Sequence, residues 1–291
     1  MTARDALRIA EPRLAQAGIP RPDLDAERLL RFALDCDQAH LIAHPERILD
    51  ASQKRTFLES IARRCRREPL QHIVGEQEFW RHSFEVSPAA LIPRPETEGL
   101  MEAALQCLAG TKRPIVVDVG TGTGCLALSL AAERRDAEVH AVDISPQALE
   151  LAQRNARRLR QSGVHFHLGS WLDPVAALVG RIDLVISNPP YVDPTTPDLA
   201  PEVADHDPAL ALFPAGGVYA AYETLVPQAA TSLRPGGWLV LELGAGLADG
   251  VAQIVSGSGL CVHDVIADLQ GIPRTLVAQR PPADAAGTPE A

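Results

Sequence analysis

The stretch Ile115-Val116-Val117-Asp118-Val119-Gly120-Thr121-Gly122-Thr123-Gly124 decides the fold class of this chain. Its first five residues are rich in β-branched side chains, which favours a buried strand. The glycines that follow allow a sharp turn and a close approach of a ligand, and the periodicity of Leu126–Ala132 predicts a helix directly afterwards. Open α/β sheets bind ligands at such loops, beyond the carboxyl ends of their strands. A tight turn without a ligand is the alternative.

Strand and helix patterns alternate from this stretch to about Ala278. The further predicted strands are Val139–Val142, Val164–Leu168, Ile182–Ser187 and Trp238–Leu243. The predicted helices include Pro146–Leu159, with Ser145 as its N-cap, and Tyr219–Leu233, which precedes a turn at Pro235-Gly236-Gly237. Repeated strand–helix units with apolar strands predict a mostly parallel, doubly wound α/β sheet. With the strand order 3-2-1-4-5, the fourth strand lies beside the first.

The chain before this sheet has a different pattern. Apolar residues recur at helical spacing up to Ile73, and a cap at Asp50 or Ser52 predicts a third helix towards Arg67. Gln77–Trp80 and Ser83–Val86 alternate apolar and polar residues as hairpin strands do. The predicted division is a helical domain at 1–73, a β-hairpin connector at 74–94, a catalytic domain at 95–280 and a disordered tail at 281–291.

Composition excludes several classes of protein. Of the 291 residues, 46% are hydrophobic and 22% are charged, which is typical of globular proteins and not of disordered ones. No run of about 18 apolar residues predicts a membrane span, and the N-terminus lacks the apolar segment of a signal peptide. The five cysteines form no CxxC pair, so we expect neither disulfides nor a zinc site and predict a cytoplasmic location.

Charge is distributed unevenly along the chain. Residues 1–75 hold 13 Lys and Arg against 11 Asp and Glu, whereas residues 76–291 hold 14 against 26. The acidic larger part argues against stable binding along nucleic acid, because binding of that kind depends on Lys and Arg replacing counterions.

Two features at strand ends point to a nucleoside cofactor and an amide substrate. Asp143 ends the second strand, 19 residues after Gly124, where a carboxylate can accept both ribose hydroxyls; a helix cap is the alternative. Ser187-Asn188-Pro189-Pro190-Tyr191 ends the fourth strand. The Asn188 oxygen and the Pro189 carbonyl could accept two N–H groups of a planar amino or amide group, and Tyr191 could lie against its flat face. An ordinary Asn-Pro turn without a binding role is the alternative.

Over about residues 5–280 the chain resembles the protein-(glutamine-N5) methyltransferases that modify peptide chain release factors, the PrmC/HemK family. Asn-Pro-Pro-Tyr alone also occurs in DNA adenine methyltransferases, whereas Leu91-Ile92-Pro93-Arg94-Pro95-Glu96-Thr97-Glu98 beside a helical N-terminal domain is more specific. The other matching segments are Pro69–Gly75, Phe79-Trp80, Val86–Pro88, Asp118–Gly124, Ala141–Asp143, Ala152–Ala156, Ser170-Trp171, Ser187–Tyr191, and Asp268-Leu269 with Gly271 and Arg274.

The resemblance implies a class I methyltransferase with a seven-stranded, mostly parallel sheet behind a helical bundle that docks the release factor. It implies S-adenosylmethionine as cofactor, S-adenosylhomocysteine as product, no metal, and methylation of the glutamine in the Gly-Gly-Gln loop of class I release factors. The implied cofactor-binding residues are Gly120, Thr121, Gly122, Thr123, Gly124, Asp143, Trp171 and Asn188. The implied substrate pocket is Asn188, Pro189, Pro190 and Tyr191, of which Asn188, Pro189 and Tyr191 are the catalytic candidates. Asp207 departs from the family, where a glutamate is expected before the proline, so that carboxylate is given no role.

Other functions stay open at this point. A ribosomal-protein glutamine methyltransferase is the nearest alternative. A DNA adenine-N6 methyltransferase would use the same amino pocket but would have to flip a base out of the duplex. A binding protein without turnover and a NAD-dependent oxidoreductase are also possible, although the second lacks G-x-G-x-x-G.

Three groups of residues are predicted to be structural. His40 and His44 lie one helical turn apart without a third ligand nearby, and His165 and His167 share one side of a strand. Arg63, Arg64, Arg66 and Arg67 are expected to form a solvated helix end. Docking of an acidic partner is the alternative for this basic run.

Overall fold

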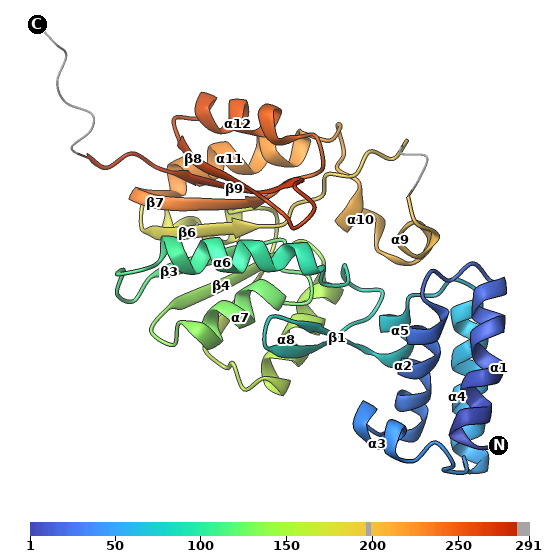
Figure 1. The fold of residues 1–291 in the computed structure, drawn as a ribbon. Helices are drawn as coiled ribbons and strands as arrows, with labels where there is room; N and C mark the ends of the chain where they lie inside the picture. Colours follow the sequence, from blue (N-terminus) through green and yellow to red (C-terminus); the bar gives the residue numbers. More distant parts are fainter. Residues whose placement is uncertain (196–198, 284–291) are drawn as a thin grey trace, which may run out of the picture. The chain divides into compact units, whose positions relative to one another are not determined.

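The computed structural model describes residues 1–195 and 199–283, which divide into a helical unit and a sheet unit. The helical unit holds residues 1–76 and 199–206, the second of which include α9 (Pro201–His206), and the sheet unit holds the other described residues (Figure 1). The predicted tail lies mainly outside the described residues, since 284–291 are not among them.

The helical unit is built from the helices α1 (Ala3–Gln16), α2 (Pro22–Leu34), α3 (Gln38–Ala43), α4 (Ala51–Cys65), α5 (Leu70–Val74) and α9. Thr2 and Asp50 begin α1 and α4 with reciprocal capping boxes, which settles the choice between Asp50 and Ser52. The apolar stripes of α1 to α5 meet in one core around Leu14, Leu30 and Phe57, to which α9 contributes no residue.

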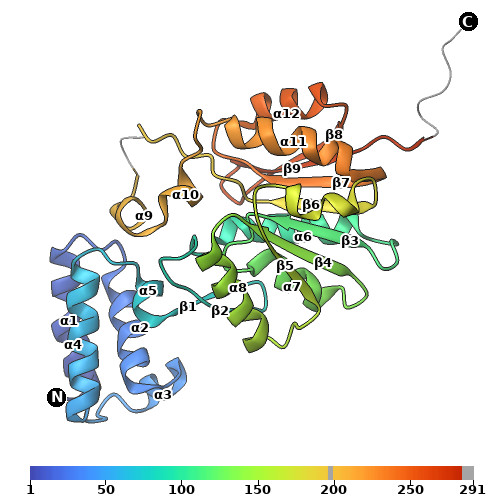
Figure 2. The same ribbon diagram turned by 180° about the vertical axis from the view of Figure 1, so that it is seen from behind.

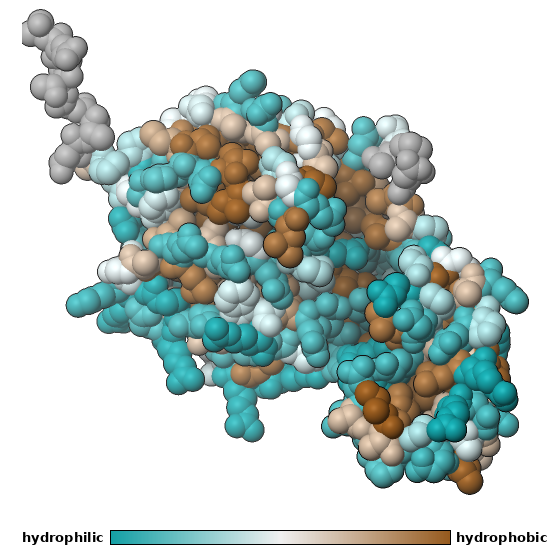
Figure 3. All heavy atoms as spheres, viewed as in Figure 1, coloured by the Kyte–Doolittle hydropathy of each residue, from teal (hydrophilic) through white to brown (hydrophobic). Residues whose placement is uncertain are grey.

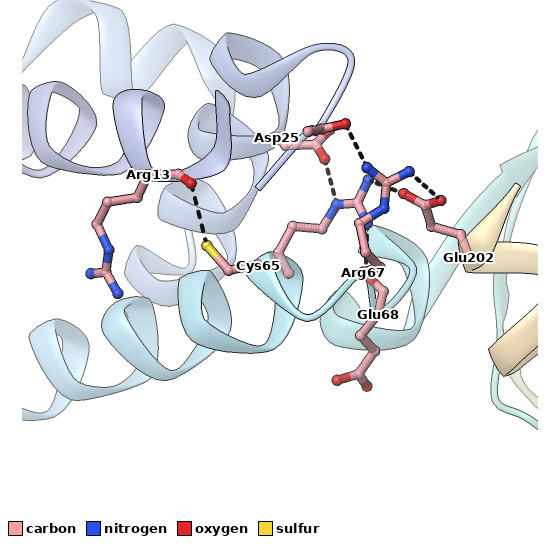
Figure 4. Close-up of polar contacts among 8 residues, drawn as sticks. Arg13, Asp25, Cys65, Arg67, Glu68 and Glu202 are labelled. Carbon is pink, nitrogen blue, oxygen red and sulfur yellow. Dashed lines mark hydrogen bonds and ion pairs between the residues drawn. The ribbon is translucent and has the colours of Figure 1, made fainter. Parts of the chain in front are cut away.

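A buried ion network joins α9 to this core, and it corrects the prediction for the basic run. Arg64 donates to Asp25 Oδ2 at 2.6 Å and lies 3.1 Å from Glu202 Oε1 in α9, while Arg67 donates to Glu202 Oε2 at 2.8 Å. Figure 4 shows Asp25, Arg67 and Glu202 converging. Only 8% of the Arg64 side chain is exposed. The prediction of a solvated helix end is therefore wrong for Arg63, Arg64 and Arg67, whose charges are paired within the unit, whereas Arg66 is exposed as predicted.

The sheet unit begins at Gln77, inside the predicted hairpin of β1 (Glu76–Phe79) and β2 (His82–Glu85). Its main sheet has the seven strands β3 (Ile115–Val119), β4 (Glu138–Asp143), β5 (Val164–Leu168), β6 (Ile182–Ser187), β7 (Leu233–Glu242), β8 (Cys261–Ala267) and β9 (Pro273–Gln279). The order is β5-β4-β3-β6-β7-β9-β8. The neighbours among β5, β4, β3, β6 and β7 pair in parallel, and β9 runs antiparallel to both β7 and β8. The predicted doubly wound, mostly parallel sheet is confirmed.

Helices cover both faces of the main sheet (Figures 1 and 2). The remaining helices are η1 (Pro95–Thr97), α6 (Glu98–Cys107), α7 (Cys125–Glu133), α8 (Pro146–Arg158), η2 (Asp173–Leu178), α10 (Ala209–Leu212), α11 (Ala220–Ser232) and α12 (Ala248–Gly257). The hairpin, α6, α7 and α8 share one core with the sheet, and η2, α11 and α12 share the other. Alternating side chains of the strands supply both cores, which is why every residue of β6 is buried.

The sequence misplaces the start of β7. The strand begins at Leu233, five residues before the predicted Trp238, because Leu233 already pairs with Ile182. A Cβ at Gly237 would lie 2.9 Å from the carbonyl oxygens of Arg234 and Ile182, so glycine lets the chain stay close to its neighbour here.

Apolar side chains also reach the surface. On the helical unit, Ile42 is 70% exposed and Ile48 is 73% exposed, and Figure 3 shows brown areas among polar ones on the near face of this unit. No helix within residues 1–195 and 199–283 is long and apolar enough to cross a membrane.

Candidate active site

A cavity of about 250 Å³ lies at the carboxyl edge of the parallel strands. Its walls come from the loops that follow four strands, together with two segments distant in sequence: Val119–Thr123, Val142–Ser145, Gly169–Trp171, Ser187–Pro190, Ala89–Arg94 with Thr97, and Pro208 with Leu210-Ala211. Parallel strands end at the same edge, so loops far apart in the chain meet there.

The glycine loop between β3 and α7 keeps its backbone open towards this cavity. Gly120 and Gly122 have φ values of +73° and +56°, which residues with a Cβ rarely adopt, and a Cβ on Gly120 would meet no atom within 4 Å. The buried Asp118 fixes the loop to the start of α7, because its Oδ2 accepts from Thr121 Oγ1 at 2.7 Å and from the Ala127 amide at 3.1 Å. Burial raises the pKa of Asp118 to about 7.

Asp143 lies on the cavity wall, as the sequence predicts. Its Oδ2 accepts from the Gly122 amide at 2.9 Å and its Oδ1 from the Ser145 amide at 2.9 Å. Burial raises the pKa of this carboxyl group, against the effect of these backbone hydrogen bonds. The cap of α8 is Ser145, whose Oγ accepts from Ala148 N, so the helix-cap alternative for Asp143 is wrong.

Asn155 is a residue whose role the sequence did not reveal. It is fully buried in α8, and its Nδ2 donates to the Thr123 carbonyl at 2.9 Å and to the Glu85 carbonyl at 3.0 Å. Its Oδ1 accepts from the Glu85 amide at 2.7 Å. One amide therefore fixes the glycine loop and the hairpin together. The only signal in the sequence was its place in the matching segment Ala152–Ala156.

Trp171 also lines the cavity, after a turn that follows β5. Its φ is +50°, unusual for a residue with a large side chain, and its ring packs partly against the core of η2, α11 and α12. This places an aromatic side chain on the same cavity as Asp143.

The Asn-Pro-Pro segment begins beside the glycine loop. Ser187 Oγ donates to the Val119 carbonyl at 2.7 Å, which ties the end of β6 to the end of β3. Asn188, Pro189 and Pro190 then line the cavity. Asn188 Nδ2 donates to Thr97 Oγ1 over 3.4 Å, a long hydrogen bond.

Tyr191 does not lie among the residues that line the cavity. Its hydroxyl donates to Glu242 Oε1 at 2.9 Å, and burial raises its pKa. A Cβ on Gly244 would lie 2.9 Å from Tyr191 Cδ2, so the ring rests against the backbone of that glycine. The other predicted site residues line the cavity with the exception of Gly124, where a Cβ would lie 3.0 Å from Leu128 Cδ1 and 3.2 Å from Ala152 Cβ.

An ion pair joins the two cavity walls that do not follow a strand, Ala89–Arg94 and Pro208–Ala211, and the sequence did not predict this pair. Arg94 Nη2 donates to Asp207 Oδ2 at 2.7 Å, and only 1% of the Asp207 side chain is exposed. Asp207 directly precedes Pro208, so the pair fixes the wall at Pro208–Ala211 to the wall at Ala89–Arg94. The carboxylate that was given no role thus has a structural one. The motif Leu91–Glu98 was the available signal.

The histidine groups take structural positions. The rings of His40 and His44 lie 4.7 Å apart. His140 Nδ1 lies 2.9 Å from His167 Nε2, and burial lowers the pKa of both histidines. Among the described residues, no group of three or more His, Cys, Asp or Glu side chains could hold a metal ion.

Two family models match the chain. Residues 5–75 match the PrmC N-terminal domain, and residues 101–205 match the methyltransferase small domain.

Similar proteins cover nearly the whole chain. A release factor glutamine methyltransferase of Koribacter versatilis is 44% identical over 97% of this chain and 99% of its own. Proteins of the same name from Cereibacter sphaeroides and Deinococcus radiodurans are 44% and 43% identical, over 97% and 96% of this chain and 100% and 99% of theirs. Among solved structures, a methyltransferase from Pyrococcus furiosus is 20% identical with a TM-score of 0.49, over 68% of this chain and 88% of that one.

Proposed function

Because the chain belongs to the release factor glutamine methyltransferase family, we propose that it methylates the side-chain nitrogen of a glutamine in peptide chain release factors, with S-adenosylmethionine as donor. It is an enzyme, a protein-glutamine methyltransferase with the class I methyltransferase fold. One observation carries the proposal: the glycine loop, Asp143 and the Asn188-Pro189-Pro190 segment line one cavity. A nucleoside site and an acceptor site for an amide thus share the same space.

The cavity fits S-adenosylmethionine. The open backbone at Gly120 leaves room for a ligand, the Asp143 carboxylate suits ribose hydroxyls, and Trp171 offers a flat apolar face for adenine. We assign cofactor binding to Gly120–Gly124, Asp143, Trp171 and Asn188. When bound, S-adenosylmethionine supplies a methyl group on a cationic sulfonium, which is a strong electrophile.

Asn188 and Pro189 hold the glutamine amide. The Asn188 oxygen and the Pro189 carbonyl accept its two N–H groups and fix its direction of approach, and orientation of this kind lowers a barrier by several kcal/mol. Pro190 completes the pocket, and Tyr191 supports it from behind through Glu242 and Gly244.

A proton must leave the nitrogen once the methyl group is transferred. Among the described residues that line the cavity, Asp143 is the one carboxylate and no histidine is present. Asp143 already accepts from two backbone amides. We therefore propose that the proton passes to water.

We propose that the helical domain at 1–73 docks the release factor. The hairpin connector at 74–94 links this domain to the catalytic domain at 95–280. The match of residues 5–75 to the PrmC N-terminal domain and the exposed side chains of Ile42 and Ile48 support this assignment. The Gly-Gly-Gln loop as target, the absence of a metal requirement and a cytoplasmic location stay proposals of the same kind. The names of the relatives favour neither ribosomal proteins nor DNA as substrate.

Methyl transfer to an intact class I release factor, mapped by mass spectrometry, tests the proposal. We expect one added methyl on the Gly-Gly-Gln glutamine, loss of turnover in Asn188→Ala, and wild-type turnover in Gln106→Ala, which removes an exposed amide on α6. Cofactor binding without methylation of a folded release factor would overturn the substrate assignment. Wild-type turnover in Asn188→Ala would overturn the assignment of the site.

A further inference from the structure

A chain of polar groups runs from the buried end of β7 to the cavity. Glu242, only 2% exposed, accepts from Tyr191 OH at 2.9 Å through Oε1 and from Thr97 Oγ1 at 2.6 Å through Oε2. Thr97, which is also buried, accepts in turn from Asn188 Nδ2 at 3.4 Å. Burial raises the pKa of Glu242, whereas Thr97, Tyr191 and Arg274 each lower it.

The hydroxyl proton of Thr97 gives this chain a direction. A hydroxyl has one proton, and Thr97 gives it to the Glu242 carboxylate, so only lone pairs of Thr97 remain on the side of Asn188. The group of Asn188 that faces Thr97 must then be the donor, its NH₂ group. The Asn188 oxygen is left to face the cavity that Asn188 lines.

The opposite orientation of the Asn188 amide is disfavoured at both of its ends. Its oxygen would face the lone pairs of Thr97, where no proton is available. Its NH₂ group would face the NH₂ group of a glutamine substrate, so that two donors would meet. Leaving a buried polar group without a partner costs about 1–3 kcal/mol, whereas one hydrogen bond contributes about 1 kcal/mol net.

We propose that Thr97 and Glu242 are positioning residues that fix the Asn188 amide with its oxygen towards the substrate nitrogen. This inference rests on the proposed function and adds to it the reason why residues 91–98 lie beside the Asn-Pro-Pro segment. Neither Thr97 nor Glu242 transfers a proton to or from the substrate. Both act through Asn188.

The first test compares Thr97→Val, which keeps the shape and removes the hydroxyl, with Thr97→Ser, which restores the hydroxyl. At saturating cofactor and release factor, kcat of Thr97→Val should fall by about tenfold to a hundredfold, the range expected when one buried hydrogen bond is left unmade. KM should change much less, and Thr97→Ser should recover most of kcat. Thr224→Val, the same change on the exposed face of α11, is the control and should keep wild-type kcat.

A second readout does not depend on turnover. The chain contains two asparagines, Asn155 and Asn188, so labelling asparagine side chains with ¹⁵N gives two NH₂ signals, and Asn188→Ala assigns them. The Asn188 signal should shift in Thr97→Val and return in Thr97→Ser.

The outcomes separate this inference from the proposed function. A wild-type enzyme that methylates no release factor contradicts the proposed function, while the NMR signals still test the orientation of Asn188. Wild-type kcat in a folded Thr97→Val variant, or equal loss in the Val and Ser variants, overturns the positioning role.

Discussion

Replacing Arg64 with methionine tests the buried network that joins α9 to the helical unit. Methionine keeps an unbranched apolar stem and removes the guanidinium group with its charge. It removes the hydrogen bond to Asp25 at 2.6 Å, the one to the Glu68 carbonyl at 2.9 Å and the ion pair with Glu202 at 3.1 Å. The side chains of Asp25 and Glu202 are only 13% and 18% exposed, so water replaces the arginine poorly.

The expected loss of stability is large. Removing one partner of a buried ion pair costs about 3–5 kcal/mol, because a buried charge stays without compensation. Arg67 still contacts Glu202, which puts the expectation at the lower end, about 3 kcal/mol. A loss of this size lowers the equilibrium constant for folding of the unit about a hundredfold.

Amide hydrogen exchange in α2 and α4, followed by mass spectrometry, measures this loss directly. Tryptophan fluorescence would not, because Trp80, Trp171 and Trp238 all belong to the sheet unit. The control is Arg63→Met on the same helix, whose partner Glu68 is paired nearer the surface, and it should cost about 1 kcal/mol or less. Protection in Arg64→Met equal to that in Arg63→Met would refute the reasoning.

Three further changes test other parts of the structure. Asn155→Ala leaves buried backbone groups of the hairpin and the glycine loop without partners, so the free energy of unfolding in urea should fall by about 1–3 kcal/mol, and no change would contradict this role. Because burial lowers the pKa of His140 and His167, the unfolded chain binds protons more readily than the folded one below pH 6.5. The free energy of unfolding should therefore decrease as the pH falls below 6.5. Replacing both histidines with glutamine should make the midpoint of urea unfolding depend less on pH. A pH dependence as steep as in the wild type would exclude these histidines as its source. Gly244→Ala brings a Cβ to 2.8 Å from Leu247 Cδ1, the end of a flexible side chain, and to 2.9 Å from the rigid ring of Tyr191, so methyl transfer should slow while circular dichroism stays unchanged, and full activity would show that the ring position is unimportant.

Local patterns in the sequence were sufficient for most of the fold. Strands with β-branched residues, such as Ile115–Val119, and helices that begin at strong caps, such as Ser145, form where their periodicity predicts them. The misplaced start of β7 has a long-range cause. Pro235-Gly236-Gly237 has the composition of a turn, but pairing of Leu233 with the neighbouring strand keeps the segment extended.

The candidate site was predictable where it depends on strand ends. The glycine loop, Asp143 and Asn188 each follow a parallel strand, so the sheet order alone brings them to one edge. Tyr191 was harder to place. Its position depends on a carboxylate 51 residues further along the chain, and nothing local indicates that its hydroxyl turns away from the cavity.

The sequence by itself therefore determined the order of the five parallel strands, the edge where ligands bind and the residues at the strand ends that line that edge, since the patterns responsible are local and parallel strands share one carboxyl edge. Only the tertiary structure decided which polar side chains pair across the chain. Thr97 with Glu242, Arg94 with Asp207 and Arg64 with Glu202 are separated by more than a hundred residues each, and burial makes each group require a partner that no local pattern identifies.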